Sequence, residues 1–341
     1  MRKRRLHRRE RKRRRNIIIF SMCLVFLGLS IGYAAFSTGI VMNAKGNVKQ
    51  KEITIIELKS EVVTSGEGLY KDYSEEGRYI YRGANPDNYL KLGNDMYRII
   101  AAEKDNTLKV IKNNNIGYMI FDVSNTRVAD YCDNTQYGCN VWGNKYTTLD
   151  FAYNNITKLP KYVGDEDTHE LPDEEATINT YLNDTWLNGL SYEIQSLIVS
   201  HIFNVGVLKV SDGQPLTTDM EQEKSYNWYG KVGLINVTDY VKASTNSACT
   251  SLKNYWDNSE CYSNSELHNW IFTYPANKDY TWTISPFFSS YTYDAYRINK
   301  GGDIGCSTVN YSMGIAPVFY LSSSIKLIGK GFENEPYVIA Q

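Results

Sequence analysis

Residues 88 to 112 have the sequence NYLKLGNDMYRIIAAEKDNTLKVIK, in which short apolar segments alternate with turn-forming triplets. The triplets GND and KDN are typical of turns, because glycine, asparagine and aspartate tolerate or stabilise tight backbone conformations. Between them, Tyr89 to Leu92, Met96 to Ala102 and Leu108 to Lys112 have the length and composition of strands. The stretch predicts an antiparallel meander, so we expect a sheet at the centre of the fold.

Further strand-like segments lie on both sides of a helical region, and together they predict an α+β fold. We expect a mostly antiparallel sheet with a central helical pair and long loops, whose first and last strands close one sheet. The polar stretch from Asn113 to Asp173 is interpreted mainly as loop. The further strand-like segments are Tyr79 to Arg82, Val232 to Val237, Trp282 to Ser285, Ala295 to Asn299, Ile315 to Leu321, Ile325 to Ile328 and Tyr337 to Ala340.

Two segments near the middle, Glu174 to Leu187 and Tyr192 to Phe203, have apolar residues at helical spacing. Ser191 directly precedes the second segment and is its candidate N-cap, since a serine side chain can accept a hydrogen bond from the first helical turn. Four residues of the second segment form an apolar stripe that we interpret as core: Ile194, Leu197, Ile198 and Ile202.

The amino-terminal region predicts a membrane anchor. Eleven of the 37 lysines and arginines lie in the first fifteen residues with a single acid, and no charged residue occurs from Ile17 to Ala44. About 20 apolar residues span a bilayer as a helix, and flanking cations stay on the cytoplasmic side. We therefore predict a basic cytoplasmic tail (1–16), a transmembrane helix or signal anchor (17–42), a tether (43–76) and an extracellular α+β domain (77–341). Within the tether, Ile53 to Leu58 is a candidate first strand.

Cleavage of this segment as a signal peptide, with secretion of the remainder, is the alternative interpretation, because small residues near Ala34 would suit a signal peptidase. The length of the apolar run, through Met42, favours retention in the bilayer instead. Without the tail the chain has 26 basic and 37 acidic residues, a net charge of −11. Such an acidic body argues against binding of nucleic acid.

Cysteine spacing also indicates export, since disulfides persist in oxidising compartments. Cys132 with Cys139, and Cys249 with Cys261, form two sequence-local couples, each interpreted as a short disulfide. Cys23 lies in the predicted membrane span, and Cys306 remains; we interpret Cys306 as a small buried strand residue, with a reactive thiol or an intermolecular bridge as the alternative. Neither spacing suits a zinc site, so no metal is predicted.

Six segments carry a resemblance to known proteins: Asn88 to Leu92, Met96 to Ile100, Tyr181 to Leu187, Trp228 to Leu234, Trp282 to Pro286 and Gly314 to Leu321. Together they resemble an uncharacterised family of Firmicute and Mollicute surface proteins, which pair one membrane span with such a domain. The resemblance covers Arg78 to the end and implies location and architecture, without an activity or cofactor. The family's closing motif has Arg before the proline where this chain has Ala316, so a role of that Arg does not carry over. A Gly-rich hairpin followed by Gly-Ile-Ala-Pro-Val is also similar to C-type-lectin-like and formylglycine-generating-type domains.

No catalytic motif is recognisable, and tyrosine and tryptophan in polar surroundings are the remaining signal, since both suit sugar stacking and protein contacts. We expect a non-enzymatic surface domain that binds a glycan or a protein. The alternatives are an extracellular enzyme, either a cell-wall or glycan hydrolase or an oxidase dependent on Cys306, and a structural envelope component. Cys306 and His268 are a candidate nucleophile pair, with Asp294 or Asp303 to orient the histidine. The candidate binding residues are Trp228, Tyr229, Trp282, Tyr293 and Asp303.

Overall fold

The computed structural model describes residues 51 to 340 with short gaps, and before them only residues 16, 19, 21, 22, 24 and 25, which are helical. The gaps are 124–126, 133–135, 151–157, 162–163, 212–213, 250, 258, 265–266, 274–278 and 288–290. The chain divides into two units, Met1–Gln50 and Lys51–Gln341. The basic tail and the predicted span, Ile17 to Met42, lie almost wholly outside the described residues. Within the described part of the chain, no helix has the length and hydropathy needed to cross a membrane.

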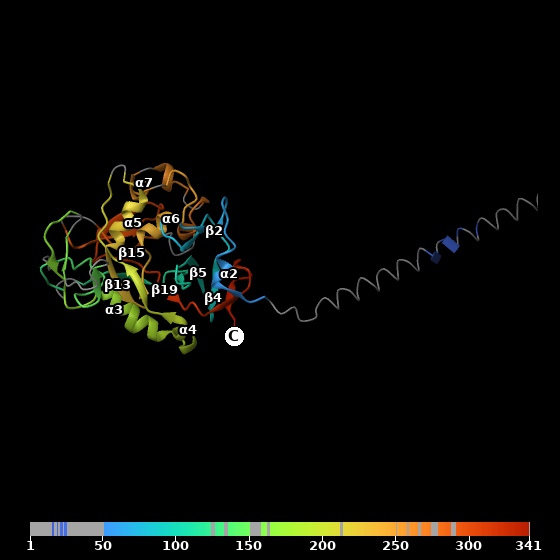
Figure 1. The fold of residues 1–341 in the computed structure, drawn as a ribbon, viewed down its shortest axis with the longest axis horizontal. Helices are drawn as coiled ribbons and strands as arrows, with labels where there is room; N and C mark the ends of the chain where they lie inside the picture. Colours follow the sequence, from blue (N-terminus) through green and yellow to red (C-terminus); the bar gives the residue numbers. More distant parts are fainter. Residues whose placement is uncertain are drawn as a thin grey trace, which may run out of the picture. The chain divides into compact units, whose positions relative to one another are not determined.

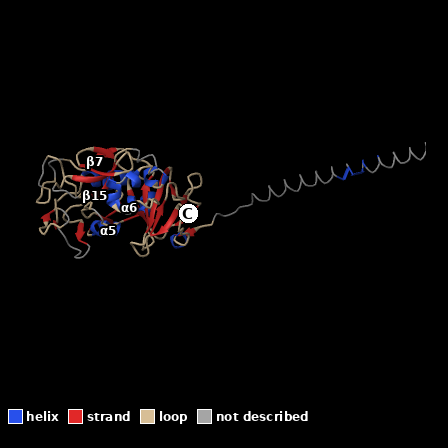
Figure 2. Cartoon of the chain, turned by 90° about the horizontal axis from the view of Figure 1, so that it is seen from above, coloured by secondary structure: helices blue, strands red, loops and turns tan. Residues whose placement is uncertain are grey.

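The second unit is α+β, with more strand than helix, as the sequence predicts (Figures 1 and 2). The described residues form an eleven-stranded sheet. Eight of its strands are, in order, β1 (Ile53–Thr54), β20 (Lys326–Ile328), β21 (Tyr337–Ile339), β4 (Tyr89–Leu92), β5 (Asp95–Ala102), β6 (Leu108–Lys112), β19 (Val318–Leu321) and β11 (Ile198–Val199). Of the other three strands, β14 (Val232–Gly233) pairs with β19, and β3 (Tyr79–Arg82) joins β2 (Gly68–Lys71) to β5.

The predicted meander is confirmed as β4, β5 and β6, which pair antiparallel in sequence order. Both turns contain a residue in the left-handed region, Gly93 with φ 60° and Asn106 with φ 67°. Glycine and asparagine are the residue types that adopt this conformation most readily, which is why the turns fall where they do. The inward side chains of β5, including Ile99, are fully buried.

The first and last strands close one sheet, as expected, since β1 pairs with β20 and β21 pairs with β4. Residues 51 to 76, which the sequence assigns to the tether, belong to this unit rather than preceding it. They contribute β1, β2 and the short helix α2 (Ile55–Leu58), which begins with a capping box between Thr54 and Glu57. Burial of Ile55 and Leu58 at the sheet, at 2% and 1% exposure, explains why this part of the chain is folded.

Three smaller sheets complete the strands of the described residues. A five-stranded sheet consists of β17 (Ile304–Thr308), β16 (Asp294–Ile298), β15 (Thr281–Pro286), β18 (Ser312–Gly314) and β7 (Tyr118–Ile120). A three-stranded sheet consists of β12 (His201–Asn204), β13 (Tyr226–Gly230) and β8 (Thr148–Asp150), and a two-stranded one of β10 (His169–Glu170) and β9 (Lys158–Leu159).

The central helical pair differs from the prediction. The first segment is one continuous helical stretch of α3 (Thr177–Thr180), a π-helical turn (Tyr181–Trp186) and a 3-10 turn (Leu187–Gly189). The second, α4 (Tyr192–Leu197), begins after Ser191 as predicted, although that side chain makes no capping bond. It then ends early, because the chain from Ile198 turns into β11 and β12.

The predicted apolar stripe is therefore interrupted. Ile198 is buried and pairs with Leu321 of β19, whereas Ile202 lies on strand β12 and is 47% exposed. The predicted strand Val232 to Val237 is also shorter than expected, since only β14 is a strand and a helix begins at Val237. The remaining helices are α5 (Leu216–Lys224), α6 (Val237–Lys242), α7 (Leu252–Asp257), α8 (Ser259–Tyr262) and α9 (Trp270–Thr273); α5, α6 and α7 lie together in Figure 1.

Both cysteine couples are disulfides, as predicted. Cys132 is bonded to Cys139 and Cys249 to Cys261, with Cα atoms 5.4 and 4.9 Å apart. Cys306 is a free, half-buried cysteine in β17.

Candidate functional site

The two candidate tryptophans are core residues. Trp228 is 4% exposed and Trp282 is fully buried. They are joined through Trp142 and Phe121 by edge-to-face contacts, with ring centroids 5.7 to 5.9 Å apart. The indole N–H of Trp228 donates to the Glu175 carboxylate over 3.4 Å, and that of Trp282 donates to the carbonyl of Met119 over 3.0 Å. Their burial indicates that these tryptophans stabilise the fold rather than contact a ligand.

The other three candidates lie in separate places. Tyr229 of β13 is 59% exposed. Tyr293, just before β16, stacks on Tyr291 with ring centroids 5.1 Å apart. Asp303 follows the β16 turn and accepts a hydrogen bond of 2.6 Å from the Asn299 amide. Of the five predicted residues, Tyr229 is the one that pairs with a residue lining a polar cavity, Ile202 of β12.

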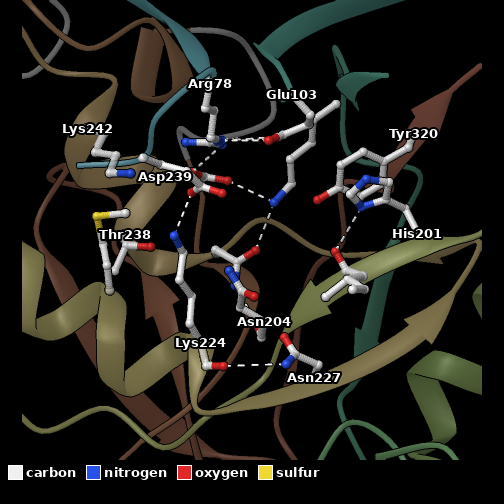
Figure 3. Close-up of a pocket in the computed structure, with 15 residues that line it drawn as sticks. Arg78, Glu103, His201, Asn204, Lys224, Asn227, Thr238, Asp239, Lys242 and Tyr320 are labelled. Atoms are coloured by element: carbon white, nitrogen blue, oxygen red, sulfur yellow. Dashed lines mark hydrogen bonds and ion pairs between the residues drawn. The ribbon is translucent and has the colours of Figure 1, made fainter. Parts of the chain in front are cut away.

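This cavity of about 230 Å³ lies between the β12 and β13 strands, the helices α5 and α6, and strands β6 and β19 (Figure 3). Its floor consists of charged side chains that are buried, its walls of amides, an imidazole and a tyrosine, and its opening of an ion pair. The charges and exposures of these three levels decide which ligand the cavity accepts.

Six charged side chains form what we call the buried ion network: Asp72, Arg78, Glu103, Lys109, Asp239 and Lys242. Arg78 donates to three carboxylates, with Nη1 to Asp72, Nε to Glu103 and Nη2 to Asp239 over 2.8 to 2.9 Å. Lys109 Nζ lies 2.8 Å from the other oxygen of Asp239, and Lys242 Nζ lies 2.7 Å from Asp72. Three cations thus face three carboxylates, and the network is neutral.

The local structure brings these groups together from distant parts of the chain. Asp239 and Lys242 are one turn apart on α6, so they share a helix face. Lys109 lies within β6, and Glu103 directly follows β5. All six residues are at most 9% exposed. An unpaired buried charge is strongly unfavourable, so removing any one member would leave the others with an uncompensated charge.

The network holds two of its carboxylates, Asp72 and Asp239, in the charged form. Burial alone would raise the pKa of Asp72, but Lys242 and Arg78 outweigh it and lower this pKa to about 2. Burial likewise opposes ionisation of Asp239, yet Arg78 and Lys109 bring its pKa well below the ordinary value. Neither group can therefore give up or take a proton near neutral pH, as a general acid or base must.

Glu223 of α5 is a buried carboxyl behind the cavity wall. It accepts hydrogen bonds from the hydroxyls of Ser285 and Thr238. Burial raises its pKa, and the two hydroxyls oppose this shift. Since Thr238 lies between Glu223 and the cavity, this acid supports the wall of the cavity and has no path to a ligand.

The middle of the cavity is polar. His201 stacks on Tyr320 with ring centroids 3.9 Å apart (Figure 3). Its Nε2 lies 3.3 Å from the Asp105 carboxylate. At the opening of the cavity, Lys224 and Glu75 form an ion pair of 2.7 Å, and their side chains are 30% and 32% exposed. Because both are partly solvated, this pair can rearrange around a ligand more readily than the buried ion network can.

The rim is formed by a cross-strand arrangement on β12 and β13. Ile202 pairs with Tyr229, and Asn204 with Asn227, so the four side chains share one face. Ile202, Asn204 and Asn227 line the cavity, while Tyr229 extends its apolar edge into solvent. Asn227 Oδ1 is buried and has no hydrogen-bond partner among the described residues. The rim thus places the apolar surfaces of Ile202 and Tyr229 beside the amides of Asn204 and Asn227. This arrangement suits a polyhydroxylated ring.

Catalytic chemistry has little support in the described residues. Burial, with a smaller effect of Asp294, raises the pKa of Cys306 to about 11, which keeps it a thiol at neutral pH. His268, the candidate partner of Cys306 in a nucleophile pair, has its Nδ1 2.8 Å from the hydroxyl oxygen of Ser244. In the part of the chain that the structure describes, no group of three or more histidines, cysteines and acids is placed to hold a metal ion.

No family model, curated protein or solved structure matches this chain. Sequence reasoning missed the buried ion network, although Lys109 within the apolar segment Leu108 to Lys112 was a signal. A lysine surrounded by strand residues on both sides requires a buried partner, but the sequence does not say that the partner is Asp239.

Proposed function

We propose that this protein is a membrane-anchored, extracellular binding module whose cavity takes a neutral sugar unit of a glycan. The basic tail and the apolar run from Ile17 to Met42 support the anchor, and two disulfides support an oxidising compartment. Membership of the surface-protein family that the chain resembles, and a C-type-lectin-like fold, belong to the same proposal.

The observation that carries the proposal is the neutral charge balance of a cavity that is nevertheless rich in polar groups. The floor is lined by three cations and two carboxylates. Asp72, which does not line the cavity, contacts two of these cations and completes the neutral buried ion network, and the opening adds one charge of each sign. An ionic ligand would gain little from this field and would have to break existing pairs. A sugar hydroxyl both donates and accepts hydrogen bonds, so it can join Lys224, Glu75 and Asn227 without displacing a charge.

Size and shape agree with a small ligand. Pockets for drug-sized molecules are about 300 to 1,000 Å³, and this cavity is about 230 Å³. It suits one ring at the end of a glycan better than an extended chain. The exposed pair of Ile202 and Tyr229 offers an apolar surface for the C–H face of that ring or of the next one.

A glycan array probed with the full-length chain tests this proposal. We expect binding to neutral glycans that is lost or reduced at least tenfold in Tyr229→Ala, because the stacking surface is removed. Tyr192→Ala is the matched control, since Tyr192 lies on α4 and is 81% exposed; it should bind as the wild type does. A blank array, or equal loss in both variants, would reject the proposal.

The same array distinguishes the enzymatic alternative. A hydrolase would release shorter fragments from a polymer, which mass spectrometry of the supernatant detects. Release of fragments by the wild type, unaffected by thiol blocking, would favour a glycan hydrolase. Loss of an activity on thiol blocking would favour the Cys306-dependent oxidase, against the high pKa of that thiol.

A further inference from the structure

The eleven-stranded sheet has an exposed face at the end formed by β1, β20 and β21. Strand register places its members in one row across the sheet. Ile328 pairs with Val338, Val338 with Lys91, and Lys91 with Met96. Paired residues point to the same side of a sheet, so these side chains share one face. Val338 is 37% exposed, Lys91 is exposed, and Ile328 and Met96 are half-buried.

The same face continues to the first strand of the unit. Lys326, two residues before Ile328 on β20, points to the same side and pairs with Thr54 of β1. Its side chain is 54% exposed and lies 3.3 Å from Glu52, whereas Lys91 forms no ion pair among the described residues. We call Lys91, Met96, Lys326, Ile328 and Val338 the entry face. It has two lysines beside one acid, on a chain whose net charge beyond the basic tail is −11.

Chain length limits which side of this unit a membrane anchor can bring to the bilayer. The predicted span ends at Met42 and the unit begins at Lys51, so eight residues separate them. Eight residues reach at most about 29 Å when fully extended. A compact domain of about 290 residues has a radius of gyration of about 19 Å and is therefore about 50 Å across. The side that bears β1 can reach the bilayer, and the far side cannot.

We propose that the entry face docks on the headgroup layer of the bilayer that holds the anchor, an inference that rests on the anchor in the proposed function. Its lysines contact lipid phosphates, to which a cation near the surface is attracted. Its apolar row lies against the boundary between headgroups and acyl chains, as the apolar side of an interfacial segment does. A short linker gives an effective concentration of about millimolar, so a small patch is sufficient.

A bilayer fits the entry face better than a second copy of this chain does. A two-fold dimer buries the same patch of both copies. It would bring two positive faces together, and Lys91 has no acid on its own face to compensate it among the described residues. Anionic lipid has the opposite charge. The proposal is also independent of the sugar-binding cavity, since no residue of the entry face lines it.

Fluorescence quenching in nanodiscs tests the proposal. The full-length chain, in a Cys23→Ser and Cys306→Ser background, carries a fluorophore at Val338→Cys or at Lys326→Cys. It is inserted, one chain per disc, into equal amounts of phosphatidylcholine and anionic phosphatidylglycerol, with or without a nitroxide on the headgroups. We expect the nitroxide to quench both labels about twofold or more, because both lie at the headgroup layer. The two positions lie on different strands, so either decides if the other variant does not fold.

Tyr146→Cys is the matched control for position. Figure 1 shows α2 and the carboxyl terminus on one side of the unit and the green loops between β7 and β10 on the other. Tyr146 belongs to these loops and is 70% exposed, so its label should not be quenched.

A charge reversal tests the lysine contact with lipid. Lys91→Glu should reduce quenching at Val338→Cys by at least half, because it replaces attraction to anionic lipid by repulsion. Lys145→Glu makes the same change in net charge beside Tyr146 and should leave this quenching unchanged.

The outcomes separate the docking from the anchor. A chain that co-purifies with the discs, but shows equal quenching at Val338→Cys and Tyr146→Cys or no effect of Lys91→Glu, would overturn the docking and leave the anchor standing. Quenching at Val338→Cys that appears only with two chains per disc would identify a second copy as the occupant, and would also overturn it. A chain that does not co-purify with the discs would refute the anchor and the docking with it.

Discussion

Replacing Asp239 by asparagine removes the carboxylate that joins Arg78 to Lys109. The substitution preserves the size of the side chain but leaves three buried cations facing two carboxylates, those of Asp72 and Glu103. Removing one partner of a buried ion pair costs about 3 to 5 kcal/mol, because the remaining charge stays buried without compensation. We expect Asp239→Asn to lower the free energy of unfolding by this amount at pH 7.5.

The structure also limits how large this loss can become. A lysine with an ordinary pKa of about 10.5 can be deprotonated at pH 7.5 at a cost of about 4 kcal/mol. Lys109, which would keep only the Asn236 side chain at 2.9 Å, is the group that would then lose its proton. In that case the unfolded state binds one proton more than the folded variant, so stability rises with pH. The deficit should shrink by up to about 1.4 kcal/mol for each pH unit between 7 and 9.

Urea unfolding followed by tryptophan fluorescence measures both effects, and Asp95→Asn is the matched control. Asp95 forms an ion pair of 2.7 Å with Lys112 but is 53% exposed, so its replacement should cost less than about 1 kcal/mol. Equal losses in the two variants would refute the importance of burial in this network. A deficit in Asp239→Asn that stays constant from pH 7 to 9 would refute the loss of a proton.

Three further predictions concern protonation. Because the pKa of Asp72 is lowered from 3.8 to about 2, it contributes about 2 kcal/mol of stability above pH 4. This contribution is lost as the pH falls from 4 to 2, and acid unfolding of Asp72→Asn should lack this step. Burial raises the pKa of Asp219 to about 6, so its charged form destabilises the fold as the pH rises from 4 to 6. Asp219→Asn should therefore increase the melting temperature at pH 7.5 and lose this advantage at pH 4; equal gains at both pH values would contradict the assignment. In a Cys23→Ser background, iodoacetamide should label Cys306 about a hundredfold more slowly at pH 7.5 than an ordinary exposed thiol, because its pKa is about 11; rapid labelling would show a thiolate.

The sheet could be predicted from the sequence to the extent that its signals are local. The meander from Tyr89 to Lys112 follows from alternation and from turn residues such as Gly93 and Asn106, which specify their own backbone conformation. The two disulfides follow from short spacings, which limit the choice of partner. Each of these features depends on residues that are close in sequence.

The missed features depend on contacts between distant segments. Ile202 continues a helical apolar stripe, yet it lies on a strand because His201–Asn204 pairs with β13. The short helix α6 resembles a strand in composition, and tertiary packing decides between the two. The buried ion network unites residues from Asp72 to Lys242, and no spacing in the sequence reveals that Arg78 meets Asp239. The cavity depends on the same long-range contacts, so the sequence offers Tyr229 as a candidate without the residues around it.

The most direct test of the account is a crystal structure of the full-length chain with a neutral oligosaccharide selected on the array. We predict difference density for one sugar ring in the cavity, with its C–H face against Ile202 and Tyr229 and its hydroxyls within hydrogen-bond distance of Lys224, Glu75 or Asn227. Density for the sugar on another face, with the Glu75 to Lys224 ion pair unchanged at 2.7 Å, would contradict the assignment of the cavity as the binding site.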